Sequence, residues 1–537
     1  MNRTAAKVWG VAIYEGKAGA IVLLGFIFAV SSWWRSSRLG FYSDDWLLLS
    51  KTIYLQGTLA EYLGANGYAR PIYGLITWLL NLLANGSPSY WQVISSGTVL
   101  ASAAVSYRLI AYMAGRLGYG ALPSLLGGLC GTVVLFFSPW MLAVFAWSTG
   151  VLTLWSLILF GVGYLMVEET ESARSKCVGS VLVLAGFLCY EAYWFTFVPL
   201  LLISKYLRFS SVVAIARAAL WYGIPLALAV SYQLVLVPLM ISRPAKAISA
   251  NFPLMLNNLA NFDRFVSPAI APAPTKAFYL ALLALVAILL VVKAISLARL
   301  ALVVAALGLG VIFTAVIYGA AGYGLAGTGV MSRTMAAPGL YFAILIGILA
   351  AATADRLSNK VRVPRIAYAA PLIFGILSAI VFMGFFSQIS EWTSSKEASK
   401  RVLDSLVAVV DSAYLRKSTK GVSVVVQIEG DQNGELFGAS YELGGAVALT
   451  KPTLVPTKSV SFVTARQGAW GTVWDGEVVV QTVCSGPLGN VAERHPSQMP
   501  PLYYRIDPRD GKVFESGFLV KDNLFGCKGS EPTVTQP

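Results

Sequence analysis

Charged residues, histidine and closely spaced cysteines are scarce in this chain of 537 residues, and each shortage excludes a class of protein. Only 12% of the residues are charged, about half the share of a soluble globular protein, while 57% are hydrophobic. The single histidine, His495, excludes a His-rich metal site, and it excludes a Ser–His–Asp triad or histidine proton relay among the apolar segments. The five cysteines show no C-x-x-C spacing, so there is no zinc-ribbon or iron–sulfur signature.

Long apolar segments are abundant instead, and they predict a polytopic α-helical membrane protein. About eleven segments are long enough to span, or nearly span, a bilayer core of about 30 Å. They fall near residues 18–34, 89–113, 121–139, 148–167, 178–190, 192–207, 218–240, 277–292, 300–319, 335–354 and 367–387. The fifth and sixth are short and form one hairpin around Tyr190 and Glu191.

The net positive charge is confined to the apolar part of the chain. Of a net charge of +14, residues 1–387 hold 25 basic against 10 acidic residues, and residues 388–537 hold 15 against 16. The basic residues lie mostly between apolar runs, as topology signals do, which argues against a nucleic-acid partner. With the N-terminus in the cytoplasm, every cytoplasmic loop carries at least one of them, and residues 388–537 emerge outside.

Two domains are predicted, a transmembrane domain over 1–387 and a soluble α/β domain over 388–537. The first includes a long outer loop, 35–88, with surface helices. In the second, an amphipathic helix over 391–415 precedes strand-like runs at 422–428, 446–449, 460–463 and 478–483. Cys484 and Cys527 lie in this part, and the sequence leaves open whether they pair in an oxidising compartment.

An acidic pair flanked by aromatic residues, Asp44 and Asp45 with Trp46, lies in the first outer loop. A carboxylate here suits a general base acting on a hydroxyl, and its neighbour suits a metal ion or an acceptor group. A structural interpretation is that Ser43 or Asp44 caps the N-terminus of a helix over 45–56. The two roles are compatible with each other.

The same loop carries Tyr68, Arg70 and Pro71 before an apolar run of only about 12 residues, 72–83. Such a run is too short to span and predicts a helix along the membrane surface. Arg70 suits a phosphate contact, an ion pair with Asp44 or Asp45, or a snorkelling interfacial position.

Further candidates lie in other outer segments. Glu191 is an isolated acid, which suggests either a residue facing a cavity or a plain hairpin turn. The Gly-rich loop 320–334 contains Tyr323 and ends near Arg333, a combination that suits an anionic phosphate. Arg264 and Lys276 are further phosphate candidates, although single basic residues here more often contact lipid headgroups.

In this order, these segments resemble the GT-C glycosyltransferases, polytopic enzymes that use polyprenyl-phosphate-linked sugars. Ser43-Asp44-Asp45-Trp46 matches the acidic motif of that family, and Tyr68-Ala69-Arg70-Pro71-Ile72 matches its opening of a surface helix. Residues 138–150, from Ser-Pro-Trp to Trp-Ser-Thr-Gly, and Leu188-Cys189-Tyr190-Glu191 resemble two further segments. With its C-terminal tail, the chain is most similar to the serotype-converting O-antigen glucosyltransferases.

The resemblance implies an inverting sugar transfer at the periplasmic face of a bacterial inner membrane. Asp44 would act as the base on the acceptor hydroxyl, and Asp45 would orient the acceptor or bind Mg²⁺ or Mn²⁺. The donor phosphate is expected at Arg70, Arg333, Arg264 and Lys276, and the sugar or acceptor at Trp46, Tyr68, Glu191 and Tyr323. The expected partners are a polyprenyl-phosphate sugar, a glycan acceptor such as O-antigen on lipopolysaccharide, and the bilayer.

The sequence leaves several other functions open. A polysaccharide polymerase or ligase would use a lipid-pyrophosphate donor at the same location. A transporter of lipid-linked sugars usually shows two corresponding halves, and no internal repeat is present in the sequence. A non-catalytic assembly protein and an arabinosyl or mannosyl transferase are further alternatives.

Overall fold

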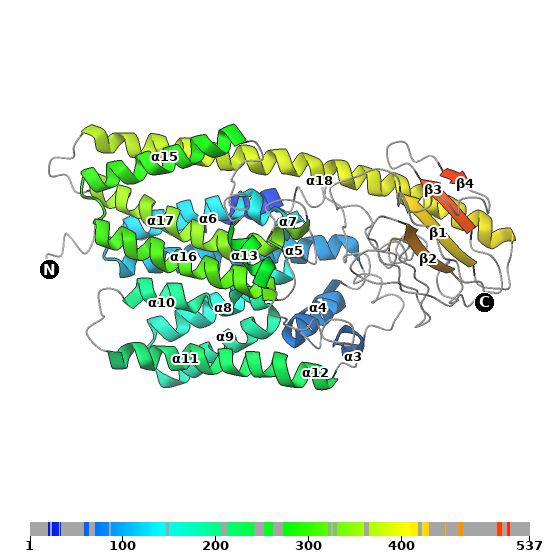
Figure 1. Ribbon diagram of the computed structural model, residues 1–537, viewed down its shortest axis with the longest axis horizontal. Helices are drawn as coiled ribbons and strands as arrows, with labels where there is room; N and C mark the ends of the chain where they lie inside the picture. The colour runs from blue at the N-terminus through cyan, green and yellow to red at the C-terminus, as the bar shows by residue number, and fades with distance from the viewer. Residues whose placement is uncertain are drawn as a thin grey trace.

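A computed structural model provides the structure of the chain. It describes residues 20–21, 24–31, 33, 58–63, 70–84, 87–146, 150–205, 212–240, 252–260, 272–320, 324–325, 330–358, 365–416, 422–428, 446, 460–465, 502–506 and 513–515. Within these ranges the chain forms a helical bundle and a small β-sheet (Figure 1).

The bundle consists of roughly antiparallel helices, through which the chain runs back and forth between the two ends of the bundle (Figure 1). Its long members are α5 (Pro88–Arg116), α6 (Ala121–Phe136), α8 (Leu152–Glu169), α9 (Ala173–Cys189), α10 (Phe197–Lys205), α11 (Val212–Ser231), α15 (Pro272–Val291), α16 (Leu297–Ala320), α17 (Ala336–Ser358) and α18 (Ala369–Arg416). A π-helical segment η5 (Tyr232–Leu236) and α12 (Val237–Met240) continue α11.

Within the described residues, six helices are long and apolar enough to cross a membrane, so the chain is a multi-pass helical membrane protein. They correspond to the predicted segments 89–113, 218–240, 277–292, 300–319, 335–354 and 367–387. The predicted segments 121–139 and 192–207 are shorter apolar helices, while 148–167 and 178–190 form α8 and α9. The described residues between 20 and 33 are helical as well, and the full number of spans stays a prediction.

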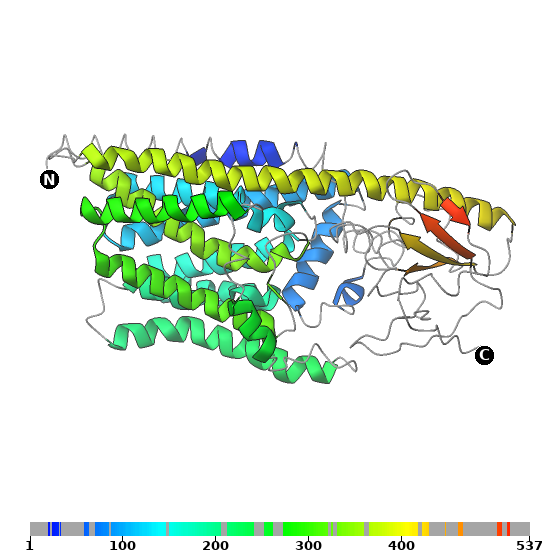
Figure 2. The ribbon, with the colours of Figure 1, turned by 45° about the horizontal axis from the view of Figure 1, so that its top comes forward.

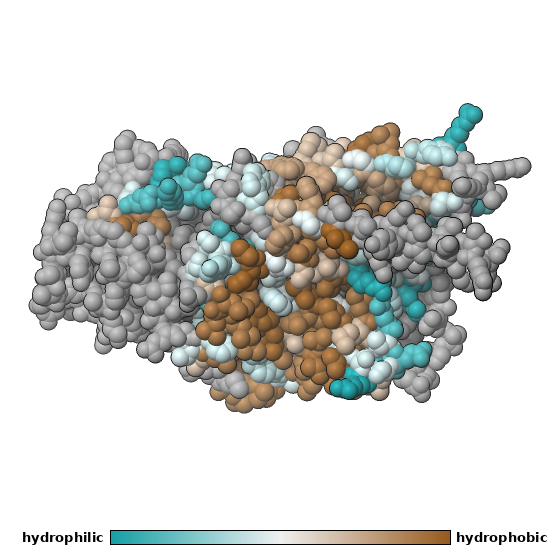
Figure 3. All heavy atoms as spheres, turned by 180° about the vertical axis from the view of Figure 1, so that it is seen from behind, coloured by the Kyte–Doolittle hydropathy of each residue, from teal (hydrophilic) through white to brown (hydrophobic). Residues whose placement is uncertain are grey.

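The outside of the bundle is apolar, as a lipid environment requires. Hydrophobic residues cover a broad continuous area of the face seen in Figure 3. Leu220, Ile224, Leu283, Leu372 and Phe386 are each more than half exposed. Because water would penalise such a surface, it is consistent with burial in hydrocarbon.

Glycines allow the helices at the centre of the bundle to approach closely. A Cβ atom added to Gly127 of α6 would lie 2.4 Å from the carbonyl oxygen of Gly347 in α17. A Cβ atom added to Gly163 of α8 would lie 2.5 Å from the carbonyl oxygen of Gly179 in α9. Small residues at such crossings are the usual means of packing helices in membranes, where lipid removes the hydrophobic drive for association.

Short elements gather at one end of the bundle, the end that faces the sheet (Figures 1 and 2). They connect the long helices and contact one another, since η6 touches η2, α7 and α17, and η3 touches α8, α9, α16 and α17. These elements are α3 (Leu59–Tyr62), α4 (Pro71–Ala84), η2 (Pro139–Met141), α7 (Leu142–Ala146), η3 (Glu191–Tyr193), α13 (Phe252–Ala260) and η6 (Val330–Met335). A last short segment, η7 (Arg365–Tyr368), precedes α18 at the opposite end.

The helix α18 is a continuous rod of 48 residues, roughly 72 Å long at about 1.5 Å per residue. It packs against α15 along the bundle and then runs on to contact strand β1 (Figure 2). The predicted change of character at Ser387 therefore falls inside a helix that continues unbroken. The predicted amphipathic helix 391–415 is the distal part of the same rod, and Ala398 and Val402 are buried there.

A four-stranded sheet lies beside the end of α18. Its order is β2-β1-β3-β4, with β1 parallel to β2 and β3, and β3 antiparallel to β4. The strands are β1 (Val422–Ile428), β2 (Val460–Ala465), β3 (Leu502–Ile506) and β4 (Val513–Glu515). The structure confirms the predicted strands at 422–428 and 460–463. The predicted strand 478–483 lies outside the described residues, and of 446–449 only Ala446 is described, as helical.

Candidate functional site

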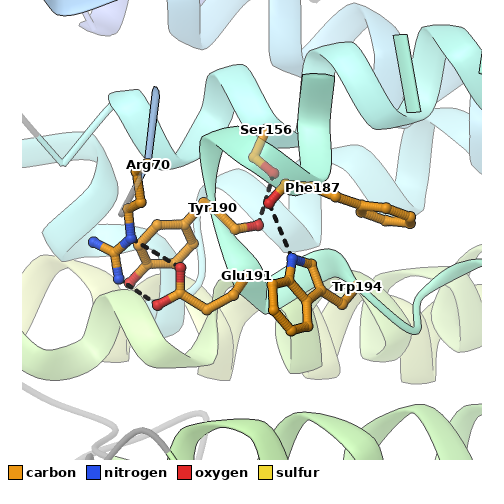
Figure 4. A network of polar contacts seen from close by, with 6 residues as sticks. All are labelled: Arg70, Ser156, Phe187, Tyr190, Glu191 and Trp194. Atoms are coloured by element: carbon orange, nitrogen blue, oxygen red, sulfur yellow. Dashed lines mark hydrogen bonds and ion pairs between the residues drawn. The ribbon is translucent and has the colours of Figure 1, made fainter. Parts of the chain in front are cut away.

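A rigid turn at the end of α9 carries Tyr190 and Glu191. Helix α9 ends at Cys189, and Tyr190 takes an extended conformation before η3 begins. The Ser156 hydroxyl of α8 donates to the carbonyl oxygens of Gly186 (2.7 Å) and Tyr190 (3.2 Å). The Trp194 indole donates to the carbonyl oxygen of Phe187 at 2.9 Å (Figure 4). These bonds satisfy the last carbonyls of α9, which lack partners within the helix, and fix the turn.

Arg70 reaches this turn from the first outer loop. It lies directly before Pro71, the first residue of α4, and its carbonyl oxygen accepts the first helical bond from Gly74 N–H at 2.9 Å. Proline suits that position because its missing N–H has no partner there. The Arg70 side chain forms a two-pronged ion pair with Glu191: Nε donates to Oε2 at 2.8 Å, and a terminal nitrogen donates to Oε1 (Figure 4).

The Tyr190 ring supports the same guanidinium. The Arg70 Cζ atom lies 4.4 Å from the ring centroid, within the range of a cation–π contact. The side chains of Arg70 and Glu191 are only 26% and 15% exposed. Burial lowers the pKa of Arg70, but the Glu191 carboxylate and its hydrogen bond outweigh this and hold that pKa above its usual range. The site therefore contains a permanent, oriented cation.

The other end of α4 is attached to α3 and α5. The Asn81 side chain donates to the Tyr62 hydroxyl and accepts from the Trp91 indole. All three residues are buried. Helix α4 is thus held at both ends, and it runs obliquely to the bundle helices while it packs against α5, α8 and α9 (Figure 2). The prediction of a helix over 72–83 is confirmed.

The segment with Pro139 and Trp140 forms η2 at the same end. Phe137, just before it, contacts Phe382 and Phe385 of α18 with ring centroids 5.2 and 5.6 Å apart. Trp140 packs edge-on against Phe342 of α17 at 5.0 Å. The adjoining element is η6, in which Arg333 is half-buried. Aromatic packing therefore joins this corner of the site to α17 and to the long α18 helix.

The Gly-rich loop is attached by Asn258 of α13. Its side-chain oxygen accepts from the Leu325 N–H at 3.0 Å, and its amide nitrogen donates to the Ala315 carbonyl of α16 at 3.4 Å. A Cβ atom on Gly319 would lie 2.6 Å from Met255, so α13 sits directly on the end of α16. Leu325 is thereby held at the end of the bundle where Glu191 lies.

Comparison with known proteins leaves the family open. No protein-family model and no curated protein sequence matches the chain. Among solved structures, the crystal structure of ArnT from Cupriavidus metallidurans bound to undecaprenyl phosphate is similar, with a TM-score of 0.42 and 10% sequence identity. The match covers 81% of this chain and 89% of the ArnT chain. A likeness at this level carries no argument about activity, so function is argued from the residues of this chain.

Four of the predicted site residues are described by the structure. Arg70 and Glu191 are brought together, a pairing that was not among the sequence-based alternatives for Arg70. Arg333 lies at the same end of the bundle, in η6. Lys276 is exposed in the first turns of α15, which lies on the opposite edge of the bundle from α4 (Figure 1).

The remaining predicted site residues, Asp44, Asp45, Trp46, Tyr68, Arg264 and Tyr323, lie outside the described residues, as do Cys484 and Cys527. Their roles stay predictions from the sequence. Among the residues that the structure does describe, no group of three or more His, Cys, Asp or Glu side chains is placed to hold a metal ion. A divalent cation at Asp44 and Asp45 is therefore still a prediction.

Sequence reasoning missed the pairing of Arg70 with Glu191 and the contribution of Ser156. The two charged residues are 121 positions apart, and no local pattern connects them. One signal was present: an isolated acid in an apolar hairpin requires a partner, and few outer basic residues were candidates.

Proposed function

We propose that this protein is a glycosyltransferase that moves a sugar from a polyprenyl-phosphate donor to a glycan, at the end of the bundle where Arg70 meets Glu191. The observation that carries the proposal is this convergence. The segments that resemble the GT-C enzymes at 70–72, 138–140 and 190–191 lie far apart in the sequence but adjoin the same end of the bundle. The end of the Gly-rich loop joins them through η6.

The chemistry of this end suits a phosphate leaving group. In the proposed step, the acceptor oxygen attacks the anomeric carbon, and Asp44 takes the hydroxyl proton. The bond between the anomeric carbon and the phosphate oxygen breaks, and its electron pair leaves with the lipid phosphate, so the configuration inverts. Arg70 and Arg333 are cations positioned at the site end, where they would stabilise the charge that develops on the phosphate.

The sugar, the acceptor and the metal complete the proposal. Glucose is the proposed sugar and O-antigen the proposed acceptor, contacted by Trp46, Tyr68, Glu191 and Tyr323. Arg264 would extend the phosphate site, whereas Lys276, on the opposite edge of the bundle from α4, suits a lipid headgroup phosphate instead. If a divalent ion takes part, carboxylate, phosphate and water oxygens at Asp44 and Asp45 suit Mg²⁺ or Mn²⁺.

The distribution of charge supports a periplasmic site in a bacterial inner membrane. Basic residues gather at the bundle end that lies away from the sheet, which is the cytoplasmic end by the positive-inside rule. The described ones there are Arg108, Arg116, Arg174, Lys176, Lys205, Arg217, Lys293, Arg299, Arg356 and Arg365, against Arg70, Lys276 and Arg333 at the site end of the bundle. This distribution supports the proposal of a cytoplasmic N-terminus and a periplasmic sheet.

The sheet and the distal part of α18 are proposed to form a soluble periplasmic domain that begins near residue 388. The length of α18 supports this, since a rod of roughly 72 Å exceeds a bilayer core of about 30 Å more than twofold. The helix would hold this domain above the site, where it could retain a polymeric acceptor.

The test is an assay of purified protein in proteoliposomes with undecaprenyl-phosphate glucose as donor and lipopolysaccharide as acceptor. Transfer is expected, and Asp44→Asn should abolish it. The control is Arg108→Gln, which removes an exposed ion pair with Glu169 on the other side of the bundle. Transfer that survives Asp44→Asn would overturn the assignment of the base.

Failure of glucosyl, mannosyl and arabinosyl donors alike would overturn the proposed reaction. Activity with lipid-pyrophosphate donors only would then indicate a polymerase or ligase. Movement of an intact lipid-linked sugar across the bilayer would indicate a transporter.

A further inference from the structure

Hydrogen bonds from neighbouring side chains fix the backbone that carries Glu191. Ser156 holds the carbonyl oxygens on either side of the end of α9, and Trp194 holds that of Phe187. Arg70, by contrast, enters the site from the start of α4, a helix that packs against α5, α8 and α9. The fixed partner in the pair is therefore the carboxylate, and the guanidinium is the group that it holds.

The pair leaves part of the guanidinium unused. Arginine has five N–H donors, and Glu191 engages Nε and one terminal nitrogen. The other terminal nitrogen points away from Glu191 (Figure 4). Within the part of the chain that the structure describes, this nitrogen forms no hydrogen bond. Tyr190 covers one face of the group, so the free N–H donors have a set direction.

We propose that Glu191 is a positioning residue, which together with the Tyr190 ring aims the free N–H donors of Arg70 at the phosphate that leaves the donor. This inference rests on the proposed function, and it changes the role of Glu191 from a contact with the sugar or acceptor to the orientation of Arg70. A planar guanidinium held by a carboxylate on one edge presents its other edge to phosphate in a defined geometry, which a lysine ammonium cannot reproduce.

Glu191→Gln retains the shape of the side chain but removes its charge. Because the lost orientation matters most when charge develops on the leaving phosphate, kcat should fall by about 10- to 100-fold while the KM for the donor changes less than about threefold. Arg70→Lys should have a similar effect on kcat, since a lysine ammonium lacks the planar, two-pronged arrangement of N–H donors. The matched control, Glu169→Gln, breaks the exposed pair with Arg108 and should leave both constants unchanged.

A charge reversal separates positioning from stability. In Arg70→Glu/Glu191→Arg, the ion pair can form again, so the thermal midpoint lost in each single variant should recover. Transfer should not recover, because the cation now stands on η3 and its free donors face a different direction. An ion pair with only a structural role would restore both the midpoint and transfer.

The experiment measures kcat, the donor KM and the thermal midpoint for the unmodified protein and for these variants, in proteoliposomes with undecaprenyl-phosphate glucose. Should Glu191→Gln fail to fold, Glu191→Asp serves in its place. Aspartate keeps the carboxylate, but its side chain is one methylene shorter and holds that group farther from Arg70. Full transfer by the charge-reversed protein, or an unchanged kcat in Glu191→Gln, would overturn the positioning role and leave the proposed reaction standing. Unmodified protein that transfers no sugar from any polyprenyl phosphate would overturn both.

Discussion

The crossing of α6 and α17 at Gly127 and Gly347 provides a quantitative test of the fold. In Gly127→Ala, the new Cβ atom would lie 2.4 Å from the Gly347 carbonyl oxygen and 2.9 Å from the Ala351 Cβ atom. Ordinary contact starts at 3.4 Å, so the two helices must separate locally by about 1 Å. The obstructing oxygen belongs to the backbone and cannot rotate aside.

The magnitude follows from two opposing terms. Alanine in place of glycine favours a helix by about 0.5–1 kcal/mol. Overpacking of a filled crossing costs about 1–3 kcal/mol. Gly127→Ala should therefore lower the free energy of unfolding by about 1–2 kcal/mol. Gly97→Ala in α5 is the control, because among the described residues no atom outside the backbone of its own helix lies within 4 Å of the added Cβ. This variant should be stabilised by about 0.5–1 kcal/mol.

Reversible unfolding in mixed detergent micelles, followed by tryptophan fluorescence, measures both variants. The opposite sign of the two effects is the decisive result. Gly127→Ala and Gly347→Ala should also be less than additive when combined, since both open the same crossing. If Gly127→Ala proves as stable as Gly97→Ala, the close approach of α6 and α17 is wrong.

Three further predictions concern the first outer loop, the topology and α18. Asn81→Leu leaves the buried Trp91 indole without its acceptor and should cost about 1–3 kcal/mol in chemical unfolding, with unchanged stability contradicting the attachment of α4. In a variant with Cys484 and Cys527 replaced by serine, the exposed Cys177, beside basic residues, should react with a membrane-impermeant maleimide in inside-out vesicles only, and labelling of Cys177 on intact spheroplasts would reverse the topology. Spin labels at Leu372 and Lys400 of α18 should lie about 42 Å apart along a straight helix, and a much shorter distance would show a bend.

Local pattern predicted the elements well. The run Val422–Ile428 has the bounds of β1, and the lengths of the apolar segments located most of the long helices to within a few residues. Both predictions succeeded because the type of secondary structure depends largely on residues that are neighbours in the sequence. The change at Ser387 was interpreted as a boundary since composition changes there from apolar to polar. Helix continuation depends instead on the absence of a breaker, and the sequence has no proline between Pro371 and Pro452.

The candidate site was predicted in its residue types but only partly in its connections. Arg70 and Glu191 were both selected as functional, each because a charge near hydrocarbon is costly without a use. Their pairing was not foreseen, because it depends on how α4 lies across α8 and α9. Such packing is set by contacts between segments far apart in the sequence, as the contacts of α4 with α8 and α9 are.

The central claim is that polyprenyl phosphate binds at the bundle end where Arg70 meets Glu191. The most direct measurement is photo-crosslinking with undecaprenyl phosphate that carries a diazirine next to the phosphate, followed by mass spectrometry of the labelled peptides. The claim predicts labels near Arg70 and η3, at 190–196, and in η6, and labelling should be competed by unmodified undecaprenyl phosphate. Labels confined to the opposite end, around 117–120 or 292–299, would contradict it.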